Sequence, residues 1–270
     1  MVVVGAQKDC VVTSWNAYLD ESYNKDVFCV GSWLAPVGTW DGIERAWAQR
    51  LQFENRKSAQ KGCPPISRYH ATDCANLKNE FSERNGWNIE RQIALSKKLC
   101  GIIERHRPIG IVNGGIVADL LKHWPELRSN GDYKRPLYYL GFITQLLEIS
   151  MRMQLRFPGN QVSVFYDQSK ELGPVAQTAY SQFLEDPSTR KVADCFVTCT
   201  PMKWQDCIPL QPADLIAYEG MKRIGGRIVG NDALRRALQA MLGKKTEIQI
   251  GYFEDQAFTT LKGMLERRPI

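Results

Sequence analysis

Three aspartates stand at positions where a binding site commonly forms. Asp20 and Asp167 each end a predicted strand, and Asp214 lies in the first turns of a predicted helix. Strand ends at one edge of an open sheet often hold a site, and a helix packed across them brings a third group there. Carboxylates gathered in this way repel one another unless a cation binds. The three aspartates therefore predict a metal site.

The cation that best suits such a set is Mg²⁺ or Mn²⁺. Both prefer oxygen ligands and keep waters or substrate phosphates in their shells. Two such ions about 3.5–4 Å apart activate a water and stabilise the leaving oxygen in phosphodiester hydrolysis. Each aspartate alone is equally typical of a turn residue or a helix cap. Their joint placement favours phosphodiester hydrolysis with these three as metal ligands.

Glu21 is a secondary candidate because it follows Asp20 directly. On a continuing strand it would face the opposite side of the sheet, whereas at a strand end it can still turn inward. The helix that carries Asp214 supports the site more clearly. Gln211, Asp214 and Tyr218 are spaced i, i+3 and i+7, so they share one helix face. Small residues beside them, at 213 and 217, let the helix approach a sheet closely.

A second local feature is His70-Ala71-Thr72-Asp73, which lies between Cys63 and Cys74. His70 is a candidate for proton transfer or for holding a phosphate or a metal, and Asp73 is a secondary candidate. Cys63, His70 and Cys74 form a weaker candidate for zinc, because their spacing fits no common pattern and no fourth ligand is evident. The structural alternative is that Thr72 and Asp73 cap a helix while His70 packs.

The charge balance permits a nucleic-acid partner. The chain of 270 residues holds 35 Lys and Arg against 29 Asp and Glu, a formal charge of +6. Residues 201–245 hold eight Lys and Arg against four Asp and Glu, and several of these cations follow the Asp214 helix. A phosphate backbone fits along such a stretch, and so does solvent around an ordinary helix face.

Cysteine usage and the apolar runs bear on the compartment. No Cys-x-x-Cys pair occurs among the eight cysteines, and we expect most of the thiols to be small buried groups. The first residues show no secretory pattern, and no apolar run reaches the roughly 18 residues of a membrane span. We therefore expect a cytoplasmic protein with no membrane partner.

The predicted elements indicate one α/β domain over residues 1–270. Strands are expected near 11–19, 27–34, 109–117, 161–167 and 192–200, and helices near 136–157, 173–185 and 209–224. Residues 39–106 form an inserted segment with helices at 39–54 and 88–106 and a loop at 55–70. Residues from about 226 to 270 form a C-terminal extension with a helix near 231–242, a strand near 246–253 and a terminal helix. Without the insertion the order is that of a ribonuclease H-like mixed sheet flanked by helices.

Three segments resemble the bacterial family called domain of unknown function 3800. They are Tyr18-Leu19-Asp20-Glu21-Ser22 with the following Phe28-Cys29-Val30-Gly31-Ser32, the internal His70-Ala71-Thr72-Asp73, and Leu210 to Glu219. The resemblance covers roughly residues 17–224, and its most specific marks are Asp-Glu-Ser and Gln-x-x-Asp. It implies a ribonuclease H-like fold and a metal-dependent nuclease whose acids are Asp20, Asp167 and Asp214. It also implies a mobile-element or antiviral-defence context.

The resulting hypothesis is a nuclease that uses one or two Mg²⁺ or Mn²⁺ ions. Asp20, Asp167 and Asp214 are its metal ligands, and His70 assists proton transfer. Its expected partners are DNA or RNA, and a second copy of the chain or a defence-system protein. The alternative is a non-catalytic module on the same fold that binds nucleic acid or protein, with the acids as caps. A third, weaker hypothesis is a metal-free hydrolase with paired carboxylates.

Overall fold

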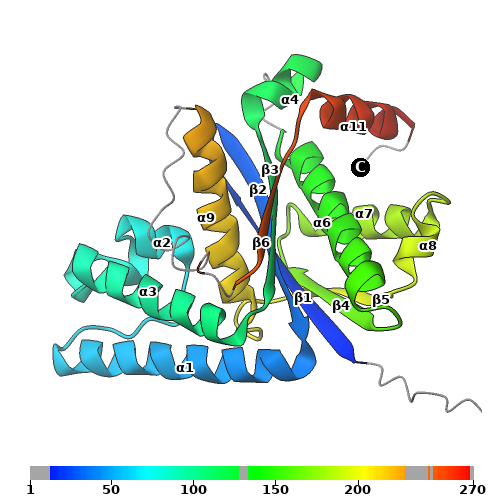
Figure 1. Cartoon of the computed structure of the whole chain (residues 1–270). Coiled ribbons are helices and arrows are strands. Elements are labelled where there is room, and N and C mark those ends of the chain that lie inside the picture. The colour runs from blue at the N-terminus through cyan, green and yellow to red at the C-terminus, as the bar shows by residue number, and fades with distance from the viewer. Residues whose placement is uncertain (1–12, 128–132, 229–242, 244–245, 268–270) are drawn as a thin grey trace, which may run out of the picture.

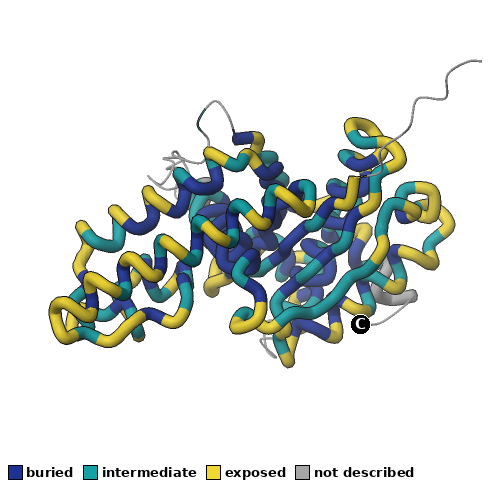
Figure 2. Tube along the Cα trace, turned by 90° about the horizontal axis from the view of Figure 1, so that it is seen from below, coloured by how far each residue is buried: buried dark blue, intermediate teal, exposed yellow. Residues whose placement is uncertain are grey.

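A computed structural model describes residues 13–127, 133–228, 243 and 246–267 of the chain. It has three layers, with a mixed sheet between two layers of helices (Figure 1). Figure 2 shows the buried residues concentrated along the strands and on the inner sides of the helices, with exposed residues on the outer turns. The predicted α/β class, with helices on both faces of a mixed sheet, is confirmed.

Six strands form the sheet in the order β5-β4-β1-β2-β3-β6. β2 is antiparallel to both β1 and β3, whereas β4 is parallel to β1, β5 to β4 and β6 to β3. The strands are β1 (Ser14–Tyr23), β2 (Val27–Pro36), β3 (Ile109–Ile116), β4 (Gln161–Asp167), β5 (Phe196–Met202) and β6 (Ile248–Tyr252). The predicted C-terminal extension therefore contributes an edge strand to the main sheet.

Alternation along the strands separates two hydrophobic cores, one on each face. In β1, Ala17 and Leu19 join one core and Tyr18 joins the other, as expected for side chains that alternate along a strand. The core that holds Leu19 is covered by α6 (Lys134–Arg156), α7 (Gly173–Glu185), α8 (Arg190–Ala193) and α11 (Asp255–Arg267), with α4 (Val117–His123) at one end.

The opposite face is covered by α9 (Leu210–Ile228) and the inserted segment. The insertion contains α1 (Val37–Gln60), α2 (Ala71–Asn76) and α3 (Ile89–His106), with two short 3-10 turns at Asn79–Phe81 and Glu83–Asn85. These helices and turns lie between Val37 and His106. Helix α9 lies tightly on β2, because a Cβ built on Gly31 would lie 2.6 Å from the backbone nitrogen of Ala217. The small residues of α9 therefore allow the predicted close approach.

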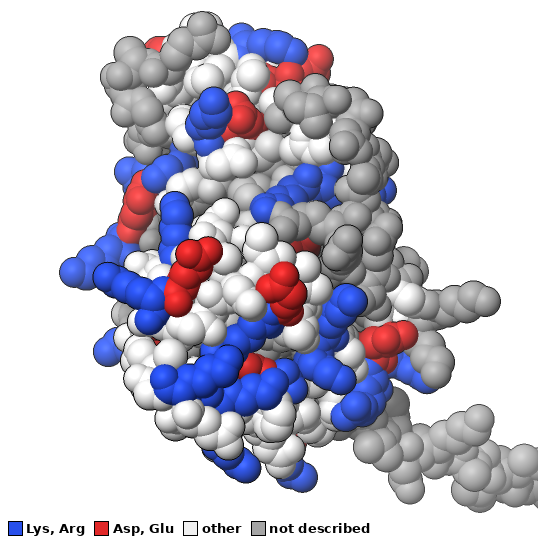
Figure 3. Space-filling model, turned by 90° about the vertical axis from the view of Figure 1, so that its left-hand side faces the viewer, with Lys and Arg blue, Asp and Glu red and all other residues white. Residues whose placement is uncertain are grey.

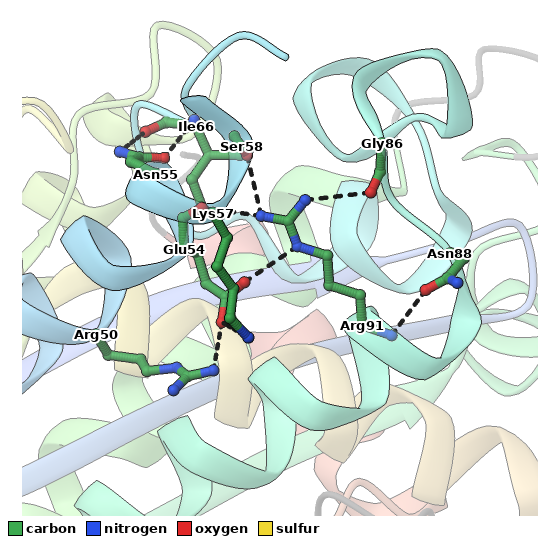
Figure 4. A network of polar contacts seen from close by, with 9 residues as sticks. All are labelled: Arg50, Glu54, Asn55, Lys57, Ser58, Ile66, Gly86, Asn88 and Arg91. Carbon is green, nitrogen blue, oxygen red and sulfur yellow. Dashed lines mark hydrogen bonds and ion pairs between the residues drawn. The ribbon is translucent and has the colours of Figure 1, made fainter. Parts of the chain in front are cut away.

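One buried ion pair holds the two long helices of the insertion together (Figure 4). Arg91 of α3 donates from Nε to Oε2 of Glu54 on α1 at 3.1 Å, and from Nη2 to the Glu54 carbonyl and the Ser58 hydroxyl. Its Nη1 donates to the carbonyl of Gly86, and Arg50 also pairs with Glu54. Only 1 % of the Glu54 side chain is exposed, so this charge needs its partners.

Substitution Arg91→Lys is expected to lower the free energy of unfolding by about 1–2 kcal/mol. Lysine keeps the charge beside Glu54, but a single ammonium cannot reproduce the planar fork that reaches four acceptors. Urea unfolding measures the change, and Arg105→Lys at an exposed position of the same helix is the control. An equal effect of the two substitutions would contradict this role for Arg91.

Four details of the predicted elements are wrong. β1 does not end at Asp20 but continues to Tyr23, because its pairing with β2 extends to Tyr23 opposite Phe28. Residues 55–60 belong to α1 rather than to a loop, and residues 190–193 form a helical turn before β5 rather than its first residues. Thr72 and Asp73 do not cap α2, since the residue before its first turn is His70 and no side chain caps it. The helix predicted near 231–242 lies outside the described residues.

Two findings concern the length and polarity of the helices and the state of the thiols. In the part of the chain that the structure describes, every helix is too short or too polar to cross a membrane. The seven described cysteines are free thiols, and Cys29, Cys74, Cys100 and Cys207 are buried. Buried thiols of this kind pack as small apolar groups.

Candidate active site

Asp20 and Asp167 lie side by side on neighbouring parallel strands. β1 and β4 pair up to Leu19 opposite Tyr166, and the two aspartates come directly after that pair. Both follow a residue of the core beneath α6, so both point to the other face, toward α9. The strand pairing therefore brings together two acids that are 147 positions apart in the sequence.

Asp214 joins them from α9, where it is the fifth residue of the helix. Only 9 % of Asp214 is exposed, and its Oδ2 accepts a hydrogen bond from the backbone N–H of Ala71 at 2.7 Å. One turn earlier, Oε1 of Gln211 accepts from the N–H of Tyr69 at 2.8 Å and from Nε1 of Trp47 at 3.0 Å. The Gln-x-x-Asp motif thus fixes the segment around His70 against α9.

The acids surround a single pocket of about 290 Å³. Asp20, Glu21, Asp167, Asp214 and His70 all line it, so five of the six predicted site residues converge. Asp73 does not line the pocket and lies behind His70. The remaining lining residues are Ser22, Tyr23, Arg68, Tyr69, Thr72, Trp204, Leu210 and Gln211.

Burial raises the pKa values of the carboxyl groups in this pocket. Burial raises the pKa of Asp20 well above its usual range, and the charges of Glu21, Asp214 and Asp167 add to that effect. Burial also raises the pKa of Asp167 and that of Asp214. At both of these groups the charges of Arg68 and His70 oppose the rise. Four carboxyl groups thus line the pocket together with one arginine and one histidine.

Glu21 reaches the same pocket from the other side of β1. Because β1 continues past Asp20, Glu21 faces the α6 layer, and it pairs across the strands with Val30 of that core. Burial and then the charge of Asp167 raise the pKa of Glu21 to about 7. Its Oε2 is buried and has no hydrogen-bond partner among the described residues. A buried carboxylate oxygen in that state indicates a missing partner, such as a proton, a water or a cation.

His70 is paired with Asp73, a contact that the sequence analysis does not predict. Nδ1 of His70 lies 2.8 Å from Oδ2 of Asp73, and about a third of the His70 side chain is exposed. Burial opposes ionisation of Asp73, but hydrogen bonds from Asn79 and His70 and the charges of His70 and Arg68 lower its pKa. The pair orients the imidazole at the wall of the pocket.

Arg68 and Trp204 are site residues that the sequence analysis missed. The guanidinium of Arg68 lies over the indole ring of Trp204 at 4.0 Å from its centroid, and both residues line the pocket. Arg68 comes from the insertion, whereas Trp204 follows β5. Only the tertiary fold brings them together, and neither residue stands in a motif that points to the other.

The donor set of the pocket fits a hard divalent cation by its chemistry. Four carboxyl groups supply oxygen ligands, their repulsion calls for positive charge, and one oxygen of Glu21 lacks a partner. As the side chains lie, however, no three His, Cys, Asp or Glu residues of the described chain are arranged to hold a metal ion. The same finding counts against a zinc site at Cys63, His70 and Cys74. His70 instead pairs with Asp73.

Four of the eight Lys and Arg in the basic stretch predicted at 201–245 lie in the described residues, and the other four lie outside them. Another basic surface is visible. Residues 37–106 hold 12 Lys and Arg against 8 Asp and Glu, so they contribute +4 of the total +6. Figure 3 shows Lys and Arg side chains spread over the face that the inserted helices form, with fewer Asp and Glu between them.

Substitution Gln211→Leu is expected to lower the free energy of unfolding by about 1–3 kcal/mol. Leucine keeps the volume approximately, but it leaves the buried N–H groups of Tyr69 and Trp47 without their acceptor. Thermal unfolding measures the change, and Gln205→Leu at an exposed position before α9 is the matched control. A Gln211→Leu protein as stable as the control would show that this anchor does not hold the His70 segment.

Comparisons of the chain with protein-family models, with curated proteins and with solved structures find no match.

Proposed function

We propose that the protein is a metal-dependent phosphodiester hydrolase that acts on nucleic acid, with Asp20, Asp167 and Asp214 as ligands of Mg²⁺ or Mn²⁺. The observation that carries the proposal is the convergence of these three acids and Glu21 on one pocket, from β1, β4 and α9. Burial raises the pKa values of all four carboxyl groups, and pKa values perturbed in this way cluster at functional sites. Perturbed carboxyl groups in a concave pocket are typical of a catalytic site.

The topology supports the same proposal by analogy. Strands β3-β2-β1-β4-β5 have the order of a ribonuclease H-like sheet, with three antiparallel strands followed by two that run parallel to the first. In this order β1 and β4 are the central neighbours, and they carry Asp20 and Asp167. Fold likeness alone does not establish an activity. We further propose that the protein belongs to the domain of unknown function 3800 family and acts in the cytoplasm, in a mobile-element or antiviral-defence system.

Each part of the pocket has a role in this reaction. A bound Mg²⁺ or Mn²⁺ would polarise the phosphoryl oxygen and lower the pKa of a water that attacks phosphorus. Asp20, Asp167 and Asp214 hold the negative charge that attracts the cation, and Glu21 adds to it. His70, oriented by Asp73, gives a proton to the leaving oxygen from the pocket wall. Arg68 supplies positive charge beside the acids for a substrate phosphate.

A nuclease panel tests the proposal. We expect cleavage of DNA or RNA strands with Mg²⁺ or Mn²⁺ and none with EDTA. Absence of cleavage with either ion, or unchanged cleavage in EDTA, would overturn the metal-dependent reaction.

The side chains as they lie do not form a finished metal site, and this observation favours one alternative, a non-catalytic nucleic-acid-binding module. Salt-sensitive binding without turnover in the same panel would support that alternative.

A further inference from the structure

A second pocket continues from the acidic pocket along the same edge of the sheet. It has a volume of about 360 Å³ and shares Asp167 and Trp204 with the first pocket. Its other lining residues are Gln168, Ser169, Lys170, Lys203 and Gln205. Asp167 is the only acid that lines it, against two lysines, so its charge is opposite to that of the first pocket. The two pockets adjoin at Asp167 and Trp204, one lined mainly by acids and the other mainly by cations, and together they are called the groove below.

The parallel pairing of β4 with β5 explains why these residues meet. Asp167 lies opposite Met202 in the register, and the N–H of Gln168 donates to the carbonyl of Met202 at 2.9 Å. The segments that carry Lys170 and Lys203 leave the two strands directly after this pair. The basic part of the groove is therefore fixed by the same sheet edge that positions the acids.

We propose that this groove binds a single-stranded polynucleotide, with one phosphodiester at the acids and the following phosphates at Lys170 and Lys203. The inference rests on the proposed function and names its substrate class. A small phosphodiester would need only the first pocket, whereas a strand has repeating phosphates that use both. Strand-binding grooves of this kind combine cations along the backbone with an aromatic ring for a base.

The lysines are free to contact phosphates. Both are exposed, and neither forms an ion pair with any residue that the structure describes. Each phosphate contact of a lysine releases counterions from the strand, so binding that uses these lysines must weaken as salt rises. Glutamine at the two positions would remove the charge and keep most of the side chain.

The aromatic ring of Trp204 favours a single-stranded nucleic acid over a duplex. Arg68 covers one face of its ring, and the residue also lines the basic pocket. A base can stack on an exposed aromatic surface only if it is not paired in a duplex, because a duplex buries its base faces. The stacked guanidinium also keeps the ring oriented.

Binding of labelled strands of about 12 nucleotides tests the proposal. It is measured by fluorescence anisotropy with Ca²⁺ in place of Mg²⁺, so that a cation with the same oxygen ligands neutralises the acids. We expect wild-type protein to bind a single strand more tightly than the matching duplex. The double variant Lys170→Gln/Lys203→Gln should weaken single-strand binding about tenfold and lower the slope of log Kd against log salt by about 1.4. Trp204→Ala should weaken it about 5- to 100-fold, and Trp204→Phe much less. DNA and RNA strands are measured in parallel to tell which sugar the groove accepts.

The control is Lys97→Gln/Lys98→Gln, which removes the same charge from exposed positions of α3. Equal weakening of single-strand binding by the two double variants, tighter binding of the duplex, or no binding at all would overturn the proposal that the groove binds a single strand. The binding assay needs no turnover, so the two claims separate. Unaltered binding by Lys170→Gln/Lys203→Gln in a protein that still cleaves nucleic acid overturns only the groove. The expected binding pattern in a protein that never cleaves overturns only the hydrolase.

Discussion

Substitution Asp20→Asn is expected to lower Mg²⁺-dependent cleavage at least about a hundredfold, since metal coordination contributes several kcal/mol to such transition states. The same substitution is expected to raise the melting temperature of the metal-free protein at about pH 8. Burial and then the charges of Glu21, Asp214 and Asp167 raise the pKa of Asp20, and an uncharged asparagine would remove both the cost of burying a charge and the repulsion. Opposite effects on activity and stability are the signature of a charged group kept for its function.

The control for this substitution is Asp26→Asn, in the exposed turn between β1 and β2. It makes the same chemical change outside the pocket, so cleavage and melting temperature should stay close to wild type. Cleavage rates are measured with excess substrate, and melting by circular dichroism in EDTA. Asp20→Asn protein that cleaves as fast as wild type would exclude Asp20 from the reaction. Asp20→Asn protein that melts earlier would show that Asp20 stabilises the fold.

The second large effect is the dependence of stability on pH and on divalent cations. Burial and the charge of Asp167 raise the pKa of Glu21 from 4.5 to about 7, and burial also raises the pKa values of Asp20, Asp167 and Asp214. Between these pH values the folded chain binds more protons than the unfolded chain. The free energy of unfolding in EDTA should therefore fall as pH rises from about 4.5 to 7.

Divalent cations should reverse that loss only where the carboxyl groups are ionised. At 100 to 1,000 times its dissociation constant, a cation that binds the folded chain alone adds about 3–4 kcal/mol. Urea unfolding at about pH 5 and pH 8, with EDTA or with Mg²⁺, measures both parts. We expect a large effect of Mg²⁺ at pH 8 and little at pH 5. Stability in EDTA that rises over this range, or equal effects of Mg²⁺ at both pH values, would contradict the account.

The sequence predicts most strands and helices of the three layers, because local residue patterns indicate them. Alternation in β1, the Pro-Gly turn after α6 and the small residues of α9 each reflect a packing requirement that nearby residues reveal. The end of β1 shows where this reasoning stops. Asp20-Glu21-Ser22 is polar and looks like a strand end, yet pairing with β2 carries the strand to Tyr23. Tertiary pairing overrides the local pattern there, and it decides which way Glu21 faces.

Some residues of the candidate site are predictable from the sequence and others are not. Asp20, Asp167 and Asp214 are predictable because the sequence pattern shows where strands end and helices begin. The structure brings all three to one pocket. Arg68 and Trp204 were missed because their contact joins an insertion to the β5–α9 connection. Nothing in either local sequence reflects a partner 136 positions away. The same holds for Lys170 and Lys203, which meet only through the pairing of β4 with β5.

Binding of Mn²⁺, followed by the loss of its electron paramagnetic resonance signal, tests most directly whether the acids of this pocket act together as a cation site. At about pH 8 the wild-type protein should bind Mn²⁺, and Mg²⁺ should displace it. Asp20→Asn should weaken the binding at least about tenfold, because it removes one of the charged ligands, whereas Asp26→Asn should bind as wild type does. No binding by the wild-type protein, or equal binding by Asp20→Asn, would contradict the central claim.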